Sequence, residues 1–328
     1  MPMLPPLDWH AFLVSWQVRP VWDALALVTL VAYVVGLRRA QAAGTRAVHP
    51  VRVGSFVAGL ALLVWTLSSA LEVYATTLFW VHMVQHLLLI MVVPALLVLG
   101  HPLTVLVAAT RGRTRSVVER VLVTGPVAVL THPLVGLGYY STVIVATHLT
   151  SFMDQMMSSP WLGPAEQALY LSSGYLLLLP LLGNEPIRWK PPQLFRIGLF
   201  LIAMTPDTVV GIVLMQTDHD LFPGMLGNRP SWAPSAVSDI NTGGALMWVG
   251  GDGLMMVFAV SLVIAIIAAP DREDLIGSWL EGVRRSSMSD HVGEGAGRQG
   301  FGDDDDVDDS DEALAAYNRM LGRLDGHR

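Results

Sequence analysis

The sequence predicts an all-α protein, a polytopic membrane helical bundle with seven transmembrane helices, its N-terminus outside and its C-terminus inside. Three observations carry this prediction. The 328-residue chain is 52% hydrophobic and only 14% charged, whereas soluble domains carry about 25% charged residues. The chain contains seven long apolar segments, and about 20 apolar residues cross the hydrocarbon layer as a helix. The basic residues of the connections alternate between many and few along the chain.

The seven apolar segments are all expected to be helices, because lipid offers their backbone groups no other hydrogen-bonding partner. The expected spans are residues 21–37, 53–74, 78–99, 134–149, 161–182, 194–216 and 243–269. The first segment lacks the basic start and the cleavage site of a signal peptide, so we interpret it as a span. Two shorter apolar stretches, 103–110 and 117–131, lie close to several arginines and are interpreted as interfacial or loop segments.

Charge sets the expected orientation, because cytoplasmic connections carry an excess of arginine and lysine. Fourteen basic residues fall in alternate connections and at the start of the tail, including Arg38, Arg111 and Lys190. The remaining connections carry only Arg19 and Arg229. Seven crossings with the N-terminus outside satisfy this pattern in every connection, and an additional span would break it.

The C-terminal tail differs in composition from the apolar body. We expect a seven-helix transmembrane domain at 1–270, a cytoplasmic linker at 271–310 that is first basic and then acidic, and a short amphipathic helix at 311–328. Eight acids fall between positions 303 and 312, and without them the formal net charge of −7 becomes +1. The linker composition predicts disorder. The last segment is either a marginal surface helix or a docking element for a cytoplasmic partner.

Composition also excludes several chemistries. The chain has no cysteine, which excludes disulfides, thiolate metal sites and cysteine nucleophiles. Its only lysine, Lys190, leaves little scope for Schiff-base chemistry, and the last expected span lacks the lysine that a retinal protein needs. No glycine-rich phosphate loop precedes a helix. We expect a non-catalytic protein whose surroundings are the lipid bilayer and that has no nucleic-acid partner.

Ionisable side chains inside the expected spans are the main functional candidates, because they are costly in lipid. His82 and His86 lie four residues apart and so share one helix face. His148, Met153 and Met215 are expected at the same outer level of the membrane. Imidazole and thioether donors without thiolates suit copper, and Cu(I) especially. Hydrogen-bonded packing of the histidines, with methionine as a core filler, is the alternative.

Several stretches resemble the CtaG family of cytochrome c oxidase assembly factors, the kind associated with caa-type oxidases in Gram-positive bacteria. The most specific is the HMxxH pattern in FWVHMVQHLLLIMVVPALLVLGHPL at 79–103, followed by THPLVGLGYYSTVIVATHLTSFMD at 131–154 and AMTPDTVVGIVLMQTD at 203–218. The resemblance implies a multi-pass protein of the bacterial plasma membrane that helps to assemble a haem–copper oxidase of the respiratory chain. Copper delivery to subunit I or II is the implied role, and the acid-rich tail is similar to those of actinobacterial members.

The resemblance also implies a ligand set. His82 and His86 match the paired histidines of the family, and His148 matches its histidine near the end of the fourth span. We expect these histidines to bind Cu(I) as a metallochaperone would, with one methionine completing the site and one carboxylate orienting the imidazoles. The candidate methionines are Met83, Met153 and Met215, and the candidate carboxylates are Glu72, Glu166 and Asp207.

The sequence departs from the family pattern at two places. An HxxEH pattern at the start of the fifth span is replaced by residues 163–167, GPAEQ, so that only Glu166 remains. The region of a histidine in the sixth span reads Asp207-Thr208. Three other functions therefore stay open. They are a b-type haem protein for electron transfer that uses His148 with His82 or His86, a copper transporter, and a scaffold without metal.

Overall fold

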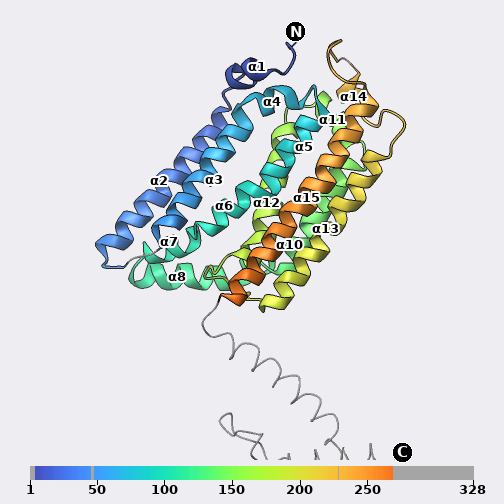
Figure 1. The fold of residues 1–328 in the computed structure, drawn as a ribbon. Coiled ribbons are helices and arrows are strands. Elements are labelled where there is room, and N and C mark those ends of the chain that lie inside the picture. The colour runs from blue at the N-terminus through green and yellow to red at the C-terminus, as the bar shows by residue number, and fades with distance from the viewer. Residues whose placement is uncertain (1–3, 46–47, 228, 269–328) are drawn as a thin grey trace, which may run out of the picture. The chain divides into compact units, whose positions relative to one another are not determined.

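The computed structural model describes residues 4–45, 48–227 and 229–268, and every regular element in these ranges is a helix. The long helices run side by side along a common direction, as Figure 1 shows. The all-α prediction is confirmed for this part of the chain. The expected linker at 271–310 and the expected tail helix at 311–328 lie outside the described residues.

The N-terminal helices begin where a cap or a proline favours a start. Helix α1 (Trp9–Val14) begins after Asp8, whose carboxylate accepts a hydrogen bond from the Ala11 amide at 2.7 Å. Helices α2 (Pro20–Ala42) and α3 (Pro50–Ser68) begin with proline, whose missing N–H costs nothing at the first helical position. The expected span at 53–74 is wrong as one helix. Ser69 ends α3, and its hydroxyl caps the separate helix α4 (Ala70–Ala75).

The third expected span is continuous but not regular. Helix α5 (Phe79–Leu87) passes through the π-helical turn η1 (Leu88–Val92) into α6 (Val93–Leu99). Pro94 in the first turn of α6 has no N–H to donate to the Ile90 carbonyl. Gly174 of α12 packs against this carbonyl so closely that no side chain would fit there.

The two stretches that the sequence assigns to interfacial or loop segments are helical. His101 adopts a left-handed conformation with φ of 53°, which ends α6 and redirects the chain into α7 (Pro102–Ala108). Helices α8 (Gly112–Val123) and α9 (Gly125–Leu130) follow. Helix α7 packs on α2, and α8 crosses one end of the bundle (Figure 1).

The C-terminal half contributes four long helices and two short ones. They are α10 (Pro133–His148), α11 (Phe152–Ser158), α12 (Leu162–Leu182), α13 (Gln193–Met215), α14 (Pro223–Leu226) and α15 (Ala236–Ile267). The connection expected around Met153 therefore contains a helix. The last span, expected from residue 243, begins at Ala236, because the Ser235 hydroxyl caps the helix by accepting from the Ser238 amide at 3.3 Å.

Small residues allow α13 and α15 to pack closely. A Cβ added at Gly244 would lie 2.7 Å from the Gly211 carbonyl oxygen, and one added at Gly211 would lie 2.9 Å from the Gly244 carbonyl oxygen. Close backbone approach through small residues is a usual way to join helices in lipid. Helix α15 also packs on α5, and α12 packs on both α10 and α6.

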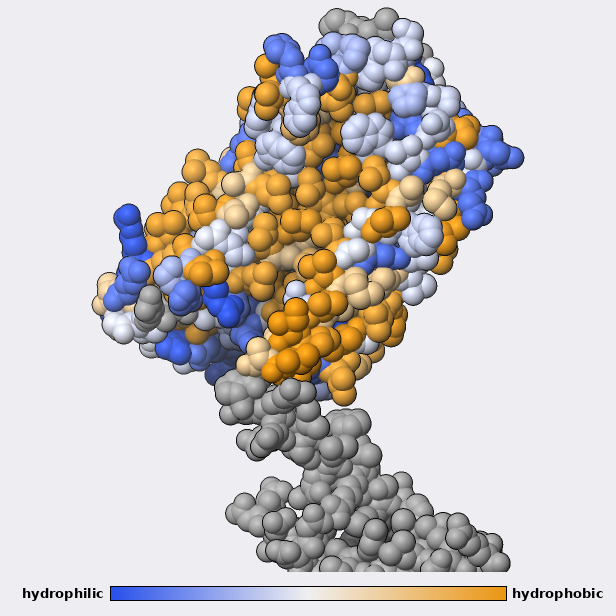
Figure 2. Space-filling view, in the orientation of Figure 1, coloured by the Kyte–Doolittle hydropathy of each residue, from blue (hydrophilic) through white to orange (hydrophobic). Residues whose placement is uncertain are grey.

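Five stretches of the described residues are long and apolar enough to cross a membrane. They are Pro20–Ala42, Pro50–Ser68, Phe79–Ala108, Gln193–Met215 and Ala236–Ile267. Figure 2 shows a hydrophobic middle zone between more hydrophilic ends. The chain is thus a helical membrane protein. Helices α10 and α12 form at the two other expected positions, and their crossing of the bilayer stays a prediction, as does the orientation.

Candidate metal centre

The first turns of α5 carry the two central histidines, and a buried carboxylate from α15 fixes where this helix starts. Asp239 accepts hydrogen bonds from the amides of Phe79 at 2.9 Å and Trp80 at 3.0 Å. These amides have no partner within the helix, so Asp239 acts as a cap from another element. Arg229 pairs with the same carboxylate at 2.5 Å. The cap stabilises the first turn of α5, and His82 and His86 lie in the second and third turns of this helix.

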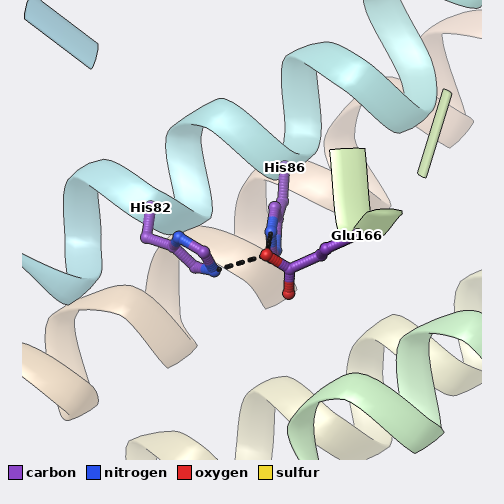
Figure 3. Close-up of side chains that lie close together, drawn as sticks. All are labelled: His82, His86 and Glu166. Atoms are coloured by element: carbon purple, nitrogen blue, oxygen red, sulfur yellow. Dashed lines mark ion pairs between the residues drawn. The ribbon is translucent and has the colours of Figure 1, made fainter. Parts of the chain in front are cut away.

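His82 and His86 converge on Glu166, which lies near the start of α12. The Oε2 atom of Glu166 lies 3.7 Å from His82 Nε2 and 3.5 Å from His86 Nε2. Figure 3 shows the carboxylate reaching across from α12 toward both imidazoles. All three side chains are buried, and one possible ligand atom from each lies within 4.8 Å of the others. We call these three residues the His–Glu group.

Several buried polar atoms in and beside the His–Glu group lack hydrogen-bond partners among the described residues. They are His82 Nε2, His86 Nδ1, Glu166 Oε1 and, on the neighbouring His148, Nε2. Leaving such atoms unpaired costs about 1–3 kcal/mol each. A bound cation would satisfy several of them at once, because imidazole nitrogens and carboxylate oxygens are metal donors. The residues present therefore fit a metal ion.

His148 borders the His–Glu group from the last turn of α10. Its ring centre lies 5.4 Å from that of His86. The Nδ1 atom donates to the Ile144 carbonyl at 3.0 Å, so the lone pair of the neutral ring lies on Nε2. Tyr170 of α12 stacks on the His86 ring at 3.9 Å between centroids, and its hydroxyl shares a 2.7 Å hydrogen bond with Thr147. These contacts restrain both imidazoles.

Glu72 binds side chains on two helices of the site and does not contact an imidazole, which corrects the expectation from sequence. Its Oε2 atom accepts from Gln85 Nε2 at 2.7 Å and from Gln167 Nε2 at 2.8 Å. Gln85 adjoins His86 on α5, and Gln167 adjoins Glu166 on α12. Arg19 pairs with the other carboxylate oxygen. Glu72 thereby ties α5 to α12 beside the His–Glu group.

Asp207 belongs to a different cluster, so its expected role in orienting an imidazole is also corrected. The Tyr140 hydroxyl donates to Asp207, and the nearby Thr208 hydroxyl donates to Asp252 at 2.7 Å. These residues connect α10, α13 and α15. Met215 is the last residue of α13, and Asp207 lies eight residues before it. The two residues are therefore about 12 Å apart along the helix axis.

The three candidate methionines have different environments. Met83 packs toward α15, since a Cβ added at Gly243 would lie 3.0 Å from Met83 Cγ. Helical geometry explains this, because Met83 follows His82 by one residue and so points about 100° away from it. Met153 on α11 is fully buried, and Met215 ends α13 half-buried. A methionine sulfur as an additional ligand stays a prediction.

Sequence reasoning missed Tyr170, Gln85 and Gln167. Tyr170 follows Glu166 by four residues, so the same spacing rule that paired His82 with His86 would have found it. The two glutamines were detectable as amides inside apolar segments, which need buried partners. Glu166 was found, but as an orienting residue rather than as a candidate ligand.

The apolar helical bundle and the buried His–Glu group near one of its ends together define a class: helical membrane proteins with a candidate metal centre. Residues 31–269 match the family described as cytochrome c oxidase caa3 assembly factor (Caa3_CtaG). The chain belongs to this family, and the resemblance seen in the sequence is confirmed. The matched range contains the whole His–Glu group and His148.

Similar proteins occur in mycobacteria. The chain is 28% identical over 323 residues to an uncharacterised protein of Mycobacterium leprae (strain TN), an alignment that covers 95% of this chain and 45% of that protein. It is 26% identical over 322 residues to uncharacterised proteins of Mycobacterium bovis and Mycobacterium tuberculosis, with the same coverage. The chain thus spans about half the length of these relatives. No solved structure matches it.

Proposed function

We propose that this chain is a non-catalytic assembly factor of the bacterial plasma membrane that binds copper at the His–Glu group and passes it to a haem–copper cytochrome c oxidase. Subunit I or II of the oxidase is the proposed recipient. Membership of the caa3 assembly factor family supports the role in oxidase assembly. The convergence of His82, His86 and Glu166 is the single observation that supports the metal-binding part.

The donor set favours copper but differs from the set expected from sequence. Imidazole suits copper, and the carboxylate is a harder donor than the expected methionine. We therefore propose that the His–Glu group holds copper in either oxidation state, and that Cu(I) additionally uses His148 or a methionine sulfur. Where only the three donors of the His–Glu group bind, a coordination position stays free. A donor of the recipient subunit would occupy it. Copper would then transfer by exchange of ligands, each bond to a donor of this chain being replaced by a bond to a donor of the recipient, with no change in the oxidation state of copper.

The position of the group suits transfer at one membrane surface. At about 1.5 Å per residue, His82 and His86 lie about 5 and 10 Å along α5 from its first residue, Phe79. This end of the bundle also carries α1, α4, α11 and α14 (Figure 1). We propose that it is the outer end, because the arginine-rich connections lie at the opposite end and basic connections stay in the cytoplasm.

A copper titration of the purified full chain in detergent tests the metal-binding proposal. We expect the wild type to bind one copper ion per chain and the double variant H82A/H86A to bind none. H219A is the matched control, because His219 is exposed, and it should bind like the wild type. Equal copper binding by the double variant and the wild type, with both folded, would refute the site. A Soret band in the purified protein would favour the haem alternative instead.

Oxidase assembly is tested in cells that lack the chromosomal copy of the gene. We expect low oxidase activity and weak oxidase spectra, and partial rescue by added copper. Plasmid-borne wild type and H219A should restore activity, and H82A/H86A should not. Restoration by H82A/H86A would mean that the assembly role is that of a scaffold and does not use the metal site.

A further inference from the structure

The end of the bundle opposite the His–Glu group carries an amphipathic surface on α8 that the proposed function does not use. Helix α8 lies across this end instead of along the bundle (Figure 1). Glycines with positive φ, Gly112 at 53° and Gly125 at 58°, form the turns at its two ends. Figure 2 shows hydrophilic residues gathered at this end of the molecule.

Four arginines lie on or directly before α8. Arg111 precedes the helix, and Arg113, Arg115 and Arg120 lie on it; all four are exposed. Glu119 is the one acid between positions 111 and 120, and it pairs with Arg115 at 2.8 Å. The segment therefore carries a clear excess of positive charge. Exposed arginines on one helix bind anionic groups well, since the guanidinium fork matches phosphate oxygens.

Helix α8 also exposes apolar residues. Val117 follows Arg113 by four residues and precedes Arg120 by three, so it shares a helix face with these two arginines. Val117 and Val121 lie one turn apart and are 48% and 51% exposed, whereas Leu122 is buried toward the bundle. Further along the chain, Val129 on α9 and Leu134 on α10 are also exposed. Helix α10 is an expected span, so the chain leads from α8 through exposed apolar residues into a helix that is expected to lie in lipid.

We propose that Arg111, Arg113, Arg115 and Arg120, together with Val117 and Val121, form a binding surface for anionic phospholipids. The valines enter the boundary of the acyl chains, and the arginines bind the phosphate headgroups above it, as in other interfacial helices. A cluster of arginines on an amphipathic helix next to a membrane span is typical of this recognition. The acidic segment 303–312 of the same chain has the opposite charge to the arginines. Binding of this segment would not account for the exposed Val117 and Val121, so the structure favours a lipid as the partner.

Native mass spectrometry of the full chain tests this surface. The protein is purified in detergent with an equal mixture of phosphatidylglycerol and phosphatidylcholine, and the lipids retained on each chain are counted. We expect the wild type to retain mainly phosphatidylglycerol. The variant R113Q/R115Q/R120Q should lose this preference, with about a fivefold fall in relative retention for each arginine. V117S/V121S should retain less of both lipids.

The control variant R38Q/R39Q/K190Q removes the same charge from exposed residues near this end. We expect its preference for phosphatidylglycerol to stay close to that of the wild type. An unchanged preference in R113Q/R115Q/R120Q, or an equal loss in the control, would overturn the proposal. So would a wild type without preference that gains one only when the eight acids at 303–312 are replaced by amides, which would assign the arginines to that segment.

Discussion

Two stretches of α5 each meet a buried carboxylate, and the two carboxylates have opposite surroundings. At the start of the helix, Asp239 accepts from two backbone amides and pairs with Arg229. One turn further, Glu166 approaches two imidazoles, and its Oε1 atom has no hydrogen-bond partner in the described part of the chain. A buried carboxylate whose oxygens all have hydrogen-bond partners stabilises the fold. A buried carboxylate beside imidazole nitrogens that have no hydrogen-bond partner is suited to binding a cation together with them.

The largest expected effect is on the stability of the Asp239 region. D239N removes the charge that balances Arg229 and weakens the cap of α5. Breaking a buried ion pair by removing one partner costs about 3–5 kcal/mol. We expect the free energy of unfolding in mixed micelles to fall by this amount, while the folded fraction still binds one copper ion. D218N is the control, because Asp218 is fully exposed, and it should change stability by less than about 0.5 kcal/mol. Loss of copper binding by folded D239N would break the comparison.

The next effect is on the metal affinity of the Glu166 region. E166Q removes a candidate ligand, so we expect copper affinity to fall by more than about 100-fold, beyond the usual effect of losing an outer partner of a ligand. Stability should stay near that of the wild type, because the amide adds no unpaired charge. Competition with a chelator measures the affinity. If E166Q binds copper as tightly as the wild type, Glu166 is not a ligand, and the distinction between the two carboxylates fails.

A smaller effect is expected at Glu72, which ties the two sides of the site together. E72Q leaves one carbonyl oxygen to accept from both Gln85 and Gln167, and it leaves Arg19 without its ionic partner. We expect copper affinity to fall by about tenfold, as for other residues that support ligands. The Cu(II) electron paramagnetic resonance spectrum should shift, since the spacing of α5 and α12 changes. Glu119, a half-exposed acid that pairs with Arg115, supplies the control E119Q. Unchanged affinity and spectrum in E72Q would show that Glu72 does not position the site.

The smallest effect concerns a third capping carboxylate, Glu185, in the connection after α12. It accepts from the amides of Leu103 and Thr104 at 3.1 and 2.8 Å at the start of α7. Burial raises its pKa above the ordinary value of 4.5, and hydrogen bonds from Thr104 oppose this rise. A raised pKa in the folded state favours the protonated form, so its stabilising contribution is present at low pH and is lost as the pH rises above the ordinary carboxyl range.

E185Q should therefore flatten the dependence of the melting temperature on pH in this range. The measurement is thermal unfolding at a series of pH values from about 4 to 7, the range set by the ordinary carboxyl pKa. E119Q again serves as the control and should keep the wild-type slope. A slope in E185Q equal to that of the wild type would mean that Glu185 does not titrate differently in the folded and unfolded states.

Much of the fold follows from apolar length, and its failures have local causes. Segment 53–74 is apolar throughout, yet the Ser69 hydroxyl offers the next amides a partner and starts a new helix. The start of α15 was missed because polar residues such as Asp239 were assigned to a loop. Asp239 is buried because it binds amides of α5, which is distant in sequence, and Arg229, which lies in a loop. A hydropathy pattern cannot predict such contacts.

The candidate site was predictable in part. The spacing of His82 and His86 places both on one face of any helix, whatever surrounds it. Glu166 could not be assigned as their partner. Apolar residues occur on every face of α12, so the sequence does not show which face turns toward α5. The distance of Met83 from the shared histidine face was predictable from the 100° step of a helix, and this argues against treating a neighbour in sequence as a neighbour in space.

The π-helical turn η1 has a consequence for how the chain encodes its metal centre. A π turn holds an extra residue, so everything before it is rotated by about 100° relative to everything after it, compared with a regular helix. With this offset, α5 presents its imidazoles to Glu166 of α12, and α6 packs on both α3 and α12. Deleting one residue between 88 and 92 would leave a longer regular helix of almost the same composition, with its imidazoles turned away from Glu166. The pocket is thus specified by a residue count as much as by residue identity.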